Sequence, residues 1–291
     1  MIIDSHYHYY PTEFNVEEKF AEMEELGISK IALIPPIIPI FKTDPKSLPI
    51  KLMKILYGKK FLLPFLKISL STFTKDKQKI DIMGTKYPLI HRVDNTPTFN
   101  IAEKYPDKFF AWCFLNPEIM SEEEIDREYN KRSKSSVFCG VKVHSFYHQY
   151  RADKLEHIFT LLQKDKKTLL IHMGFDDYEP ILSLADKYPD VNIIMAHCGF
   201  PYFQIIWDDI IKRKNIFVDI SSSPYVNRKL AFSAVKKLGV DRCIYGCDGP
   251  FGAQKNNHFD LGYMIEDILN HFPADVREKV GYKNFEKIIF S

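Results

Sequence analysis

Several histidines, one lysine and one aspartate stand where apolar segments of this chain end. The chain begins MIIDSHYH, so His6 and His8 lie one residue apart shortly after an apolar run. Alternate residues of a strand point to the same face, so these two imidazoles would share one side. Later apolar runs end in the same manner, at Lys142, His144, His172, His197 and Asp248. If these runs are parallel strands of one barrel, the side chains meet at one end of it.

A metal ion would account for so many imidazoles in one place. Grouped imidazoles repel one another when they are protonated, whereas a cation holds them as neutral ligands. Each residue also has a structural explanation when it is taken alone. A histidine at a strand end can be a hydrogen-bonded core residue, and an aspartate after a strand can cap the next helix. The coincidence of several such residues at matching positions favours a divalent-metal site.

The elements that would position these residues alternate regularly. Eight short apolar runs are expected as strands, at residues 1–6, 30–36, 110–117, 139–144, 168–174, 192–199, 216–222 and 242–249. Amphipathic segments follow most of them, as expected for helices. Continuous apolar runs are typical of parallel strands buried on both faces, and their alternation with helices predicts a (β/α)8 barrel. An open doubly wound sheet is the alternative, but no glycine-rich dinucleotide-binding loop supports it.

The expected helices cover residues 15–26, 154–164, 177–188, 202–214, 226–238 and 260–271. A further charged helix begins with Ser121 and Glu124, which have the spacing of a capping box. Tyr147 and His148 fall in a predicted loop and are expected at the surface.

Residues 36–97 interrupt this alternation with a stretch rich in proline, apolar and basic residues. Connections within α/β units usually have about 2–6 residues, so a segment of this length needs a function. It would leave from the carboxyl end of the second strand, where barrel active sites are built. We therefore expect one barrel domain over residues 1–291, with 36–97 as a lid or pocket wall. A dimer contact and binding to a membrane surface are the alternatives.

Segments along the whole chain resemble the amidohydrolase superfamily. The resemblance is to the branch that contains aminocarboxymuconate-semialdehyde decarboxylase and related metal-dependent hydrolases and carboxy-lyases. The matching segments are IIDSHYH (2–8), KYPDKFFAWCFLNPE (104–118), FCGVKVHS (138–145), LLIHMG (169–174), KYPDVNIIMAHCG (187–199), NIFVDISS (215–222), RCIYGCDGPFG (242–252) and KNFEKII (283–289). They cover nearly all of the chain outside 36–97. The resemblance implies a TIM barrel with an insertion after the second strand.

The resemblance also implies a ligand set and catalytic residues. One divalent ion, with zinc as the first expectation, would be bound by His6, His8, His172 and Asp248. Imidazole and carboxylate ligands suit zinc, and also iron, manganese or cobalt. His197 would be the general acid/base, and Asp248 would accept a proton from the metal-activated water.

In the branch resembled, Lys142 and His144 would bind a substrate carboxylate or each hold a pocket wall. In some members of the superfamily a lysine at this strand is carboxylated and bridges two metal ions, so Lys142 would then be a ligand and the chain would bind two ions. A Lys142 side chain that only reaches out of the barrel is a third alternative. Asp4 is either a partner of the ligands or a capping residue, and Asp219 is expected to be a structural hydrogen-bonding residue.

Two enzymatic activities fit this chemistry. The favoured one is hydrolysis, in which metal-activated water attacks the carbonyl of an amide, lactone or ester of a small molecule. The alternative is non-oxidative decarboxylation of an aromatic or enol acid. Such decarboxylases need a cation over the substrate carboxylate. No arginine lies beside a matching segment, so the candidates are Arg92 and Arg151 in predicted loops, or Lys142 and His144 in their place. A barrel that has become a binding protein is a third class, which the complete ligand set argues against.

The composition fits a cytoplasmic enzyme. The net charge of +2 does not call for nucleic acid as a partner, and no apolar run reaches the roughly 18 residues that span a bilayer. No signal peptide is visible at the start, and the five scattered cysteines are expected to be reduced core residues. Homodimers are common in the branch resembled, and the apolar insertion offers a contact surface for one.

Overall fold

The computed structural model describes residues 1–42, 44–55, 59–70, 72–82, 84–256 and 258–290. Within them, eight parallel strands form one sheet in chain order. These strands are β1 (Ile2–His8), β2 (Ile28–Ile34), β6 (Phe109–Phe114), β7 (Phe138–His144), β8 (Leu169–His172), β9 (Ile193–Met195), β10 (Ile216–Asp219) and β11 (Cys243–Ile244). All eight predicted strands are present, and the predicted (β/α)8 barrel is confirmed.

Hydrogen bonds between β1 and the chain around β11 close the barrel. The Ser5 amide donates to the Tyr245 carbonyl at 3.1 Å, and the Asp248 amide donates to the His6 carbonyl at 2.8 Å. Gly246 permits this close approach, because a Cβ there would lie only 2.9 Å from the Cβ of His6. The sheet therefore has the closed order of a barrel and not that of the open, doubly wound alternative.

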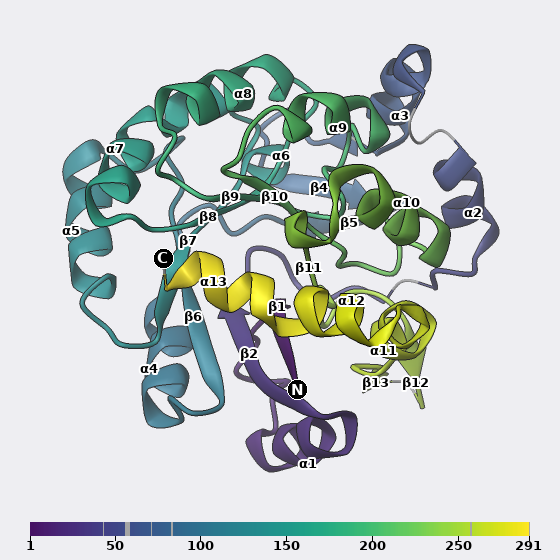
Figure 1. Cartoon of the computed structure of the whole chain (residues 1–291). Coiled ribbons are helices and arrows are strands. Elements are labelled where there is room, and N and C mark those ends of the chain that lie inside the picture. The colour runs from purple at the N-terminus through teal and green to yellow at the C-terminus, as the bar shows by residue number, and fades with distance from the viewer. Residues whose placement is uncertain (43, 56–58, 71, 83, 257, 291) are drawn as a thin grey trace.

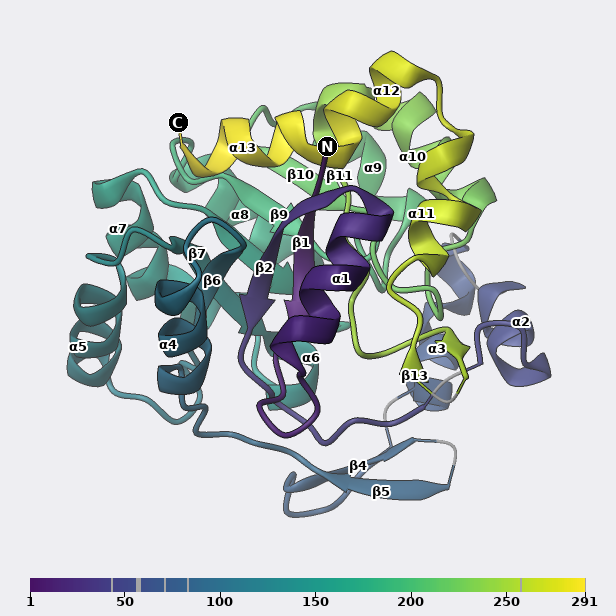
Figure 2. The same ribbon diagram turned by 90° about the horizontal axis from the view of Figure 1, so that it is seen from below.

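Burial on both faces explains the apolar runs of the strands. Every residue of β1, β6 and β7 is buried. Inside the barrel, Nε1 of Trp112 donates to the Ser5 carbonyl at 3.0 Å, and Phe285 of α13 (Asn284–Ile289) packs against the Trp112 ring. Figure 2 shows α13 at the amino ends of the strands. The five cysteines are buried and unpaired, as expected.

Helices follow the strands and cover the outside of the barrel (Figure 1). They are α1 (Val16–Leu26), α4 (Thr96–Lys104), α5 (Glu122–Arg132), α7 (Glu156–Asp165), α8 (Tyr178–Lys187), α9 (Gln204–Ile211), α10 (Arg228–Leu238), α11 (Tyr263–Asp267) and α12 (Ala274–Glu278). The short helix α6 (Ser145–His148) instead lies at the carboxyl end of the barrel, directly after β7 (Figure 2). Ser121 and Glu124 form the predicted capping box. The helix predicted over 260–271 is instead α11 followed by a 3-10 turn at Leu269–His271. None of the helices in the described part of the chain is long and apolar enough to cross a bilayer.

The segment between β2 and α4 forms the predicted insertion. It contains α2 (Leu48–Ile55), α3 (Leu63–Leu70) and a three-stranded antiparallel sheet of β3 (Thr72–Phe73), β4 (Lys79–Ile82) and β5 (Thr85–Pro88). In Figure 2, β4 and β5 lie below the arrowheads of β1 and β2, at the carboxyl ends of the barrel strands. Phe41 contacts Phe251 and Phe73 contacts Phe146, with ring centroids 4.9 and 5.6 Å apart. The insertion therefore adjoins the end of the barrel where the candidate residues stand.

Candidate active site

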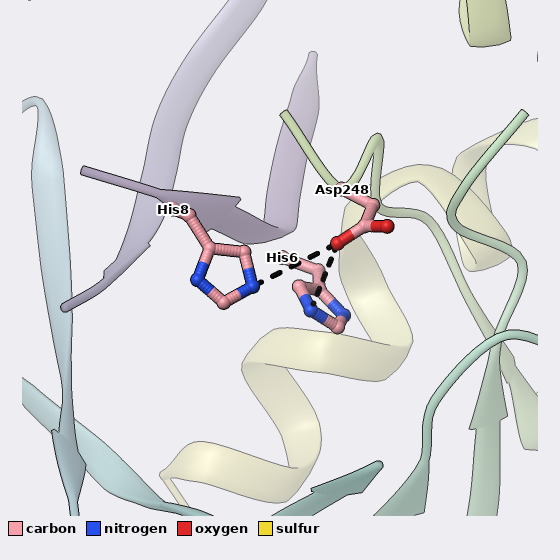
Figure 3. A group of neighbouring side chains, drawn as sticks. All are labelled: His6, His8 and Asp248. Carbon is pink, nitrogen blue, oxygen red and sulfur yellow. Dashed lines mark ion pairs between the residues drawn. The ribbon is translucent and has the colours of Figure 1, made fainter. Parts of the chain in front are cut away.

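Two histidines of β1 and the aspartate after β11 lie together at the carboxyl end of the barrel. Nε2 of His6 is 3.4 Å from Oδ1 of Asp248, and Nε2 of His8 is 3.8 Å from the same oxygen (Figure 3). One donor atom from each of the three residues lies within 4.8 Å of the others, and all three side chains are buried. Two imidazole nitrogens and a carboxylate oxygen are a donor set that can hold a divalent metal ion.

Backbone hydrogen bonds hold Asp248 in place. Asp248 has a φ of 62°, a left-handed conformation that costs roughly 1–2 kcal/mol for a residue with a Cβ. The hydrogen bond from its backbone amide to the His6 carbonyl stabilises this conformation. Oδ1 of Asp4 accepts hydrogen bonds from the amides of His6 and Cys247 at 3.1 and 3.0 Å, so it connects the candidate ligand His6 to the residue before Asp248. Burial raises the pKa of Asp248 well above its usual range, and a bound cation would reverse this effect.

The hydrogen bonds that His6 and His8 make through Nδ1 leave a lone pair on Nε2 of each ring, on the side of this group. Nδ1 of His6 lies 2.9 Å from Oδ2 of Asp219, and Nδ1 of His8 lies 3.4 Å from the Pro35 carbonyl. A carboxylate and a carbonyl only accept hydrogen bonds, so Nδ1 carries the proton in both rings and Nε2 is free to ligate. Burial lowers the pKa of both rings, that of His8 to about 3, so both are neutral near pH 7.

His172, which ends β8, and His197, which follows β9, adjoin the same group. Nδ1 of His172 is 3.2 Å from Nε2 of His197, and the latter atom is 3.9 Å from Oδ2 of Asp248. His172 is outside the three-residue group, but its Nε2 is buried and has no hydrogen-bond partner among the described residues. Because a buried nitrogen without a partner is costly, this atom fits a further ligand position. The donor atoms present therefore fit the metal ion that the sequence predicts.

Lys142 and His144 lie at the end of β7, beside these histidines. Lys142 is fully buried, and its Nζ has no hydrogen-bond partner in the described part of the chain. Burial lowers the pKa of Lys142 to about 8, although the charges of Asp219 and Asp248 act in the opposite direction. The His144 ring stacks on that of His172 with centroids 4.0 Å apart. The structure thus brings all seven predicted site residues to one end of the barrel.

Asp219 of β10 and nearby Ser221 connect several of the histidines. Oδ1 of Asp219 accepts hydrogen bonds from the His197 amide at 2.8 Å and from the Ser221 hydroxyl. Oγ of Ser221 lies 2.8 Å from Nδ1 of His197. The sequence analysis predicted Asp219 as a hydrogen-bonding residue but missed Ser221. The segment IFVDISS contains the signal, because Asp219 and Ser221 have the spacing of two residues on one face of a strand.

Aromatic side chains surround the site. Tyr225 and Phe200 contact His172 with centroids 6.2 and 5.0 Å apart, and Phe251 contacts His8 at 5.4 Å. Tyr147 stacks on His144 at 4.1 Å. The expectation that Tyr147 is at the surface is wrong, because its ring packs against His144 and Phe146 and Tyr147 is only 8% exposed.

His148 was also expected at the surface, and this expectation is wrong as well. Its side chain is 2% exposed, and Nε2 lies 3.2 Å from the carbonyl of Ile90 in the insertion. Burial lowers the pKa of His148 to about 4. The short helix α6 is therefore enclosed between the barrel and the insertion, which local sequence does not reveal.

The fold and the site define a class of protein, a (β/α)8 barrel with a histidine and carboxylate group at the carboxyl ends of its strands. A family model described as amidohydrolase matches residues 87–289. The chain therefore belongs to the amidohydrolase family, as the matching segments of the sequence indicated, and it is an enzyme of that superfamily. Among curated protein sequences, none matches the chain.

Solved structures share the fold over nearly the whole chain at low sequence identity. A dihydroxybenzoic acid decarboxylase from Polaromonas sp. JS666, with bound manganese and the inhibitor 2-nitroresorcinol, is 14% identical, has a TM-score of 0.62 and is matched over 99% of this chain and 96% of its own. The 5-carboxyvanillate decarboxylase from Sphingomonas paucimobilis is 13% identical with a TM-score of 0.60, over 99% and 98%. A TIM-barrel protein from Bordetella bronchiseptica is 14% identical with a TM-score of 0.64, also over 99% and 98%. At these identities the likeness shows the barrel fold.

Proposed function

We propose that this chain is a divalent-metal-dependent decarboxylase that acts on a small aromatic acid. The observation that carries the proposal is the Lys142 ammonium group, which is fully buried and has no hydrogen-bond partner among the residues that the structure describes. Asp219 and Asp248 act on Lys142 through their charges but do not hydrogen-bond to its Nζ. A buried cation without a direct partner is costly, and a substrate carboxylate would be that partner. This is the cation that the sequence analysis required for decarboxylation. Two of the solved structures with the same fold are decarboxylases of aromatic acids, which also supports the proposal.

The aromatic walls support an aromatic substrate. Phe200, Tyr225 and Tyr147 place rings around His172 and His144, where they would pack against a planar substrate. The insertion, as a lid, would keep water out. Decarboxylation converts a charged carboxylate into neutral carbon dioxide, so a site with little water disfavours the reactant more than the product.

The chain's own residues would divide the work as follows. His6, His8, His172 and Asp248 would hold a divalent ion, which would supply Lewis-acid chemistry for a substrate oxygen. Lys142 pairs with the carboxylate and orients it. His197 takes up a proton at Nε2 from a hydroxyl group of the substrate and delivers it to the ring carbon that bears the carboxylate. The carbon–carboxylate bond then breaks, its electron pair returns to the ring, and carbon dioxide leaves, so that one proton replaces one carboxylate.

Hydrolysis at a two-metal site is the second candidate, and the lowered pKa of Lys142 favours it. A lysine with a pKa of about 8 is partly neutral near that pH, and only a neutral amine reacts with carbon dioxide to give a carbamate. A carbamate on Lys142 would add oxygen ligands for a second ion. Metal analysis separates the two candidates, because the decarboxylase proposal expects one ion per chain and the hydrolase candidate expects two.

The test is an assay of the purified chain, loaded with zinc or manganese, against hydroxylated and methoxylated benzoic acids beside lactones, esters and amides. We expect metal-dependent release of carbon dioxide from at least one acid, and its loss in Lys142→Met. Lys19→Met is the matched control, because Lys19 is also buried but lies on α1, where it pairs with Glu22. Turnover of lactones, esters or amides without any release of carbon dioxide would make the decarboxylase proposal wrong.

A further inference from the structure

Four buried polar side chains form a continuous chain of hydrogen bonds across the site. The Ser221 hydroxyl donates to Asp219, Oγ of Ser221 is 2.8 Å from Nδ1 of His197, and Nε2 of His197 is 3.2 Å from Nδ1 of His172. None of the four side chains is more than 5% exposed, so water offers few other partners. The positions of the protons along this chain therefore depend on the groups at its two ends.

The carboxylate of Asp219 determines the direction in which the hydrogen bonds of this chain are donated. A carboxylate only accepts hydrogen bonds, and Oδ1 of Asp219 also accepts from the amides of His197 and Ser221, at 2.8 and 3.1 Å. The single hydroxyl proton of Ser221 points to this oxygen, where the hydrogen bond is charge-assisted. The Ser221 oxygen then accepts from His197, so Nδ1 of His197 carries a proton and Nε2 carries a lone pair.

The reverse direction would leave two groups without partners. If Ser221 donated to Nδ1 of His197, its oxygen and that of Asp219 would face each other with no proton between them. His172 would then carry its proton on Nε2, which has no acceptor among the described residues. A buried donor without an acceptor costs more than one hydrogen bond contributes, so the first direction is favoured.

We propose that Ser221 is a positioning residue that sets the tautomers of His197 and His172. In the favoured direction both rings carry a proton on Nδ1. Nε2 of His172 then keeps a lone pair for the metal ion, and Nε2 of His197 is the atom that takes up and returns the catalytic proton. Asp219 orients three histidines, His6 directly and the other two through Ser221. This inference rests on the roles given to His172 and His197 in the proposed function.

The test compares Ser221→Ala, which removes the hydroxyl, with Ser221→Thr, which keeps it. The matched control is Ser29→Ala, since the Ser29 hydroxyl also bonds to a buried strand, at the Ile2 carbonyl at the other end of the barrel. Nitrogen-15 NMR of histidine-labelled, metal-free protein near neutral pH reports which ring nitrogen carries the proton, and a His197→Gln sample assigns the signals. We expect His197 to be protonated on Nδ1 in the native chain, in Ser221→Thr and in Ser29→Ala, and to lose this preference in Ser221→Ala.

Kinetics with a substrate identified by the assay proposed above would give a second readout. Ser221→Ala is expected to lower kcat about 10- to 100-fold with little change in KM, the size of effect of one hydrogen bond to a charged group, and Ser221→Thr to recover most of it. A proton on Nε2 of His197 in the native chain, or the same tautomers in Ser221→Ala as in the native chain, would overturn the inference. The NMR result needs no substrate, and the tautomer of His197 in the native chain can overturn the inference without any serine variant, so the inference is tested even if the decarboxylase proposal fails.

Discussion

Asp219→Asn tests how the fold prepares His6 as a ligand. Asparagine keeps the shape of aspartate but replaces one carboxylate oxygen with an NH2 group, which only donates. Oδ1 of Asp219 receives three hydrogen bonds, from the amides of His197 and Ser221 and from the Ser221 hydroxyl, so the asparagine oxygen is expected at this position. The NH2 group then replaces Oδ2, which is 2.9 Å from Nδ1 of His6.

The substitution requires Nδ1 of His6 to accept a hydrogen bond where it donates one in the native chain. An NH2 group facing Nδ1 needs an acceptor, so the His6 proton moves to Nε2 and the lone pair that would bind the metal is lost. Loss of such a partner of a metal-binding histidine typically lowers metal affinity about 10- to 100-fold. These factors correspond to roughly 1.4–2.8 kcal/mol of binding free energy. We expect the upper end, about 100-fold, because asparagine also favours the wrong tautomer.

The assay is a competition titration of the metal-free chain with zinc against a chelating dye, with thermal unfolding measured in parallel. Asp177→Asn is the matched control, because Asp177 is also buried and accepts from the amides of Gly174 and Ala152 at 2.6 and 2.7 Å, with no histidine among its partners. Asp177→Asn should lower stability without changing zinc affinity. The tautomer argument is refuted if Asp219→Asn binds zinc as tightly as the native chain, or if both variants weaken zinc binding equally.

Three further predictions follow from particular residues. Lys142→Met should keep one zinc ion and should not lower the free energy of unfolding in urea titrations, because an apolar side chain replaces a buried, unpaired cation; a fall from two ions to one would instead support the two-metal site. The metal-free chain should lose stability as the pH falls from 6.5 to about 4, because His148 has a pKa of about 4 when folded and 6.5 as the reference value, so only the unfolded chain binds the proton in this window. His148 should contribute about 1.36 kcal/mol per pH unit to the fall in the free energy of unfolding. Urea titrations of His148→Leu should show a dependence of this free energy on pH that is smaller by that amount, and an unchanged dependence would contradict the argument. Phe41→Ser should raise the KM of the aromatic substrate several-fold at unchanged zinc affinity, since Phe41 packs on Phe251 beside His8, whereas the exposed Phe290→Ser should change neither.

The strands and the predicted site residues could be recognised from local sequence. Parallel strands of a barrel are buried on both faces, so each reads as an uninterrupted apolar run such as FFAWCF in β6. The carboxyl ends of such strands converge, and the residues that end them, from His6 to Asp248, were therefore expected together. The helix predicted over 260–271 was less reliable, because its short pieces depend on packing against the rest of the chain more than on their own periodicity.

Only the tertiary structure decided which atoms face one another. Asp219 is 213 positions from His6 in the chain, and no local pattern joins them, yet their hydrogen bond determines where the His6 proton lies. Ser221 was likewise recognised as a positioning residue only because folding places its hydroxyl beside His197. A lysine at a strand end is expected to pair or to reach solvent, and the closed barrel instead leaves Lys142 buried. Sequence determines which side chains are available at each strand end, whereas desolvation, hydrogen-bond partners and proton positions depend on neighbours that only folding brings together.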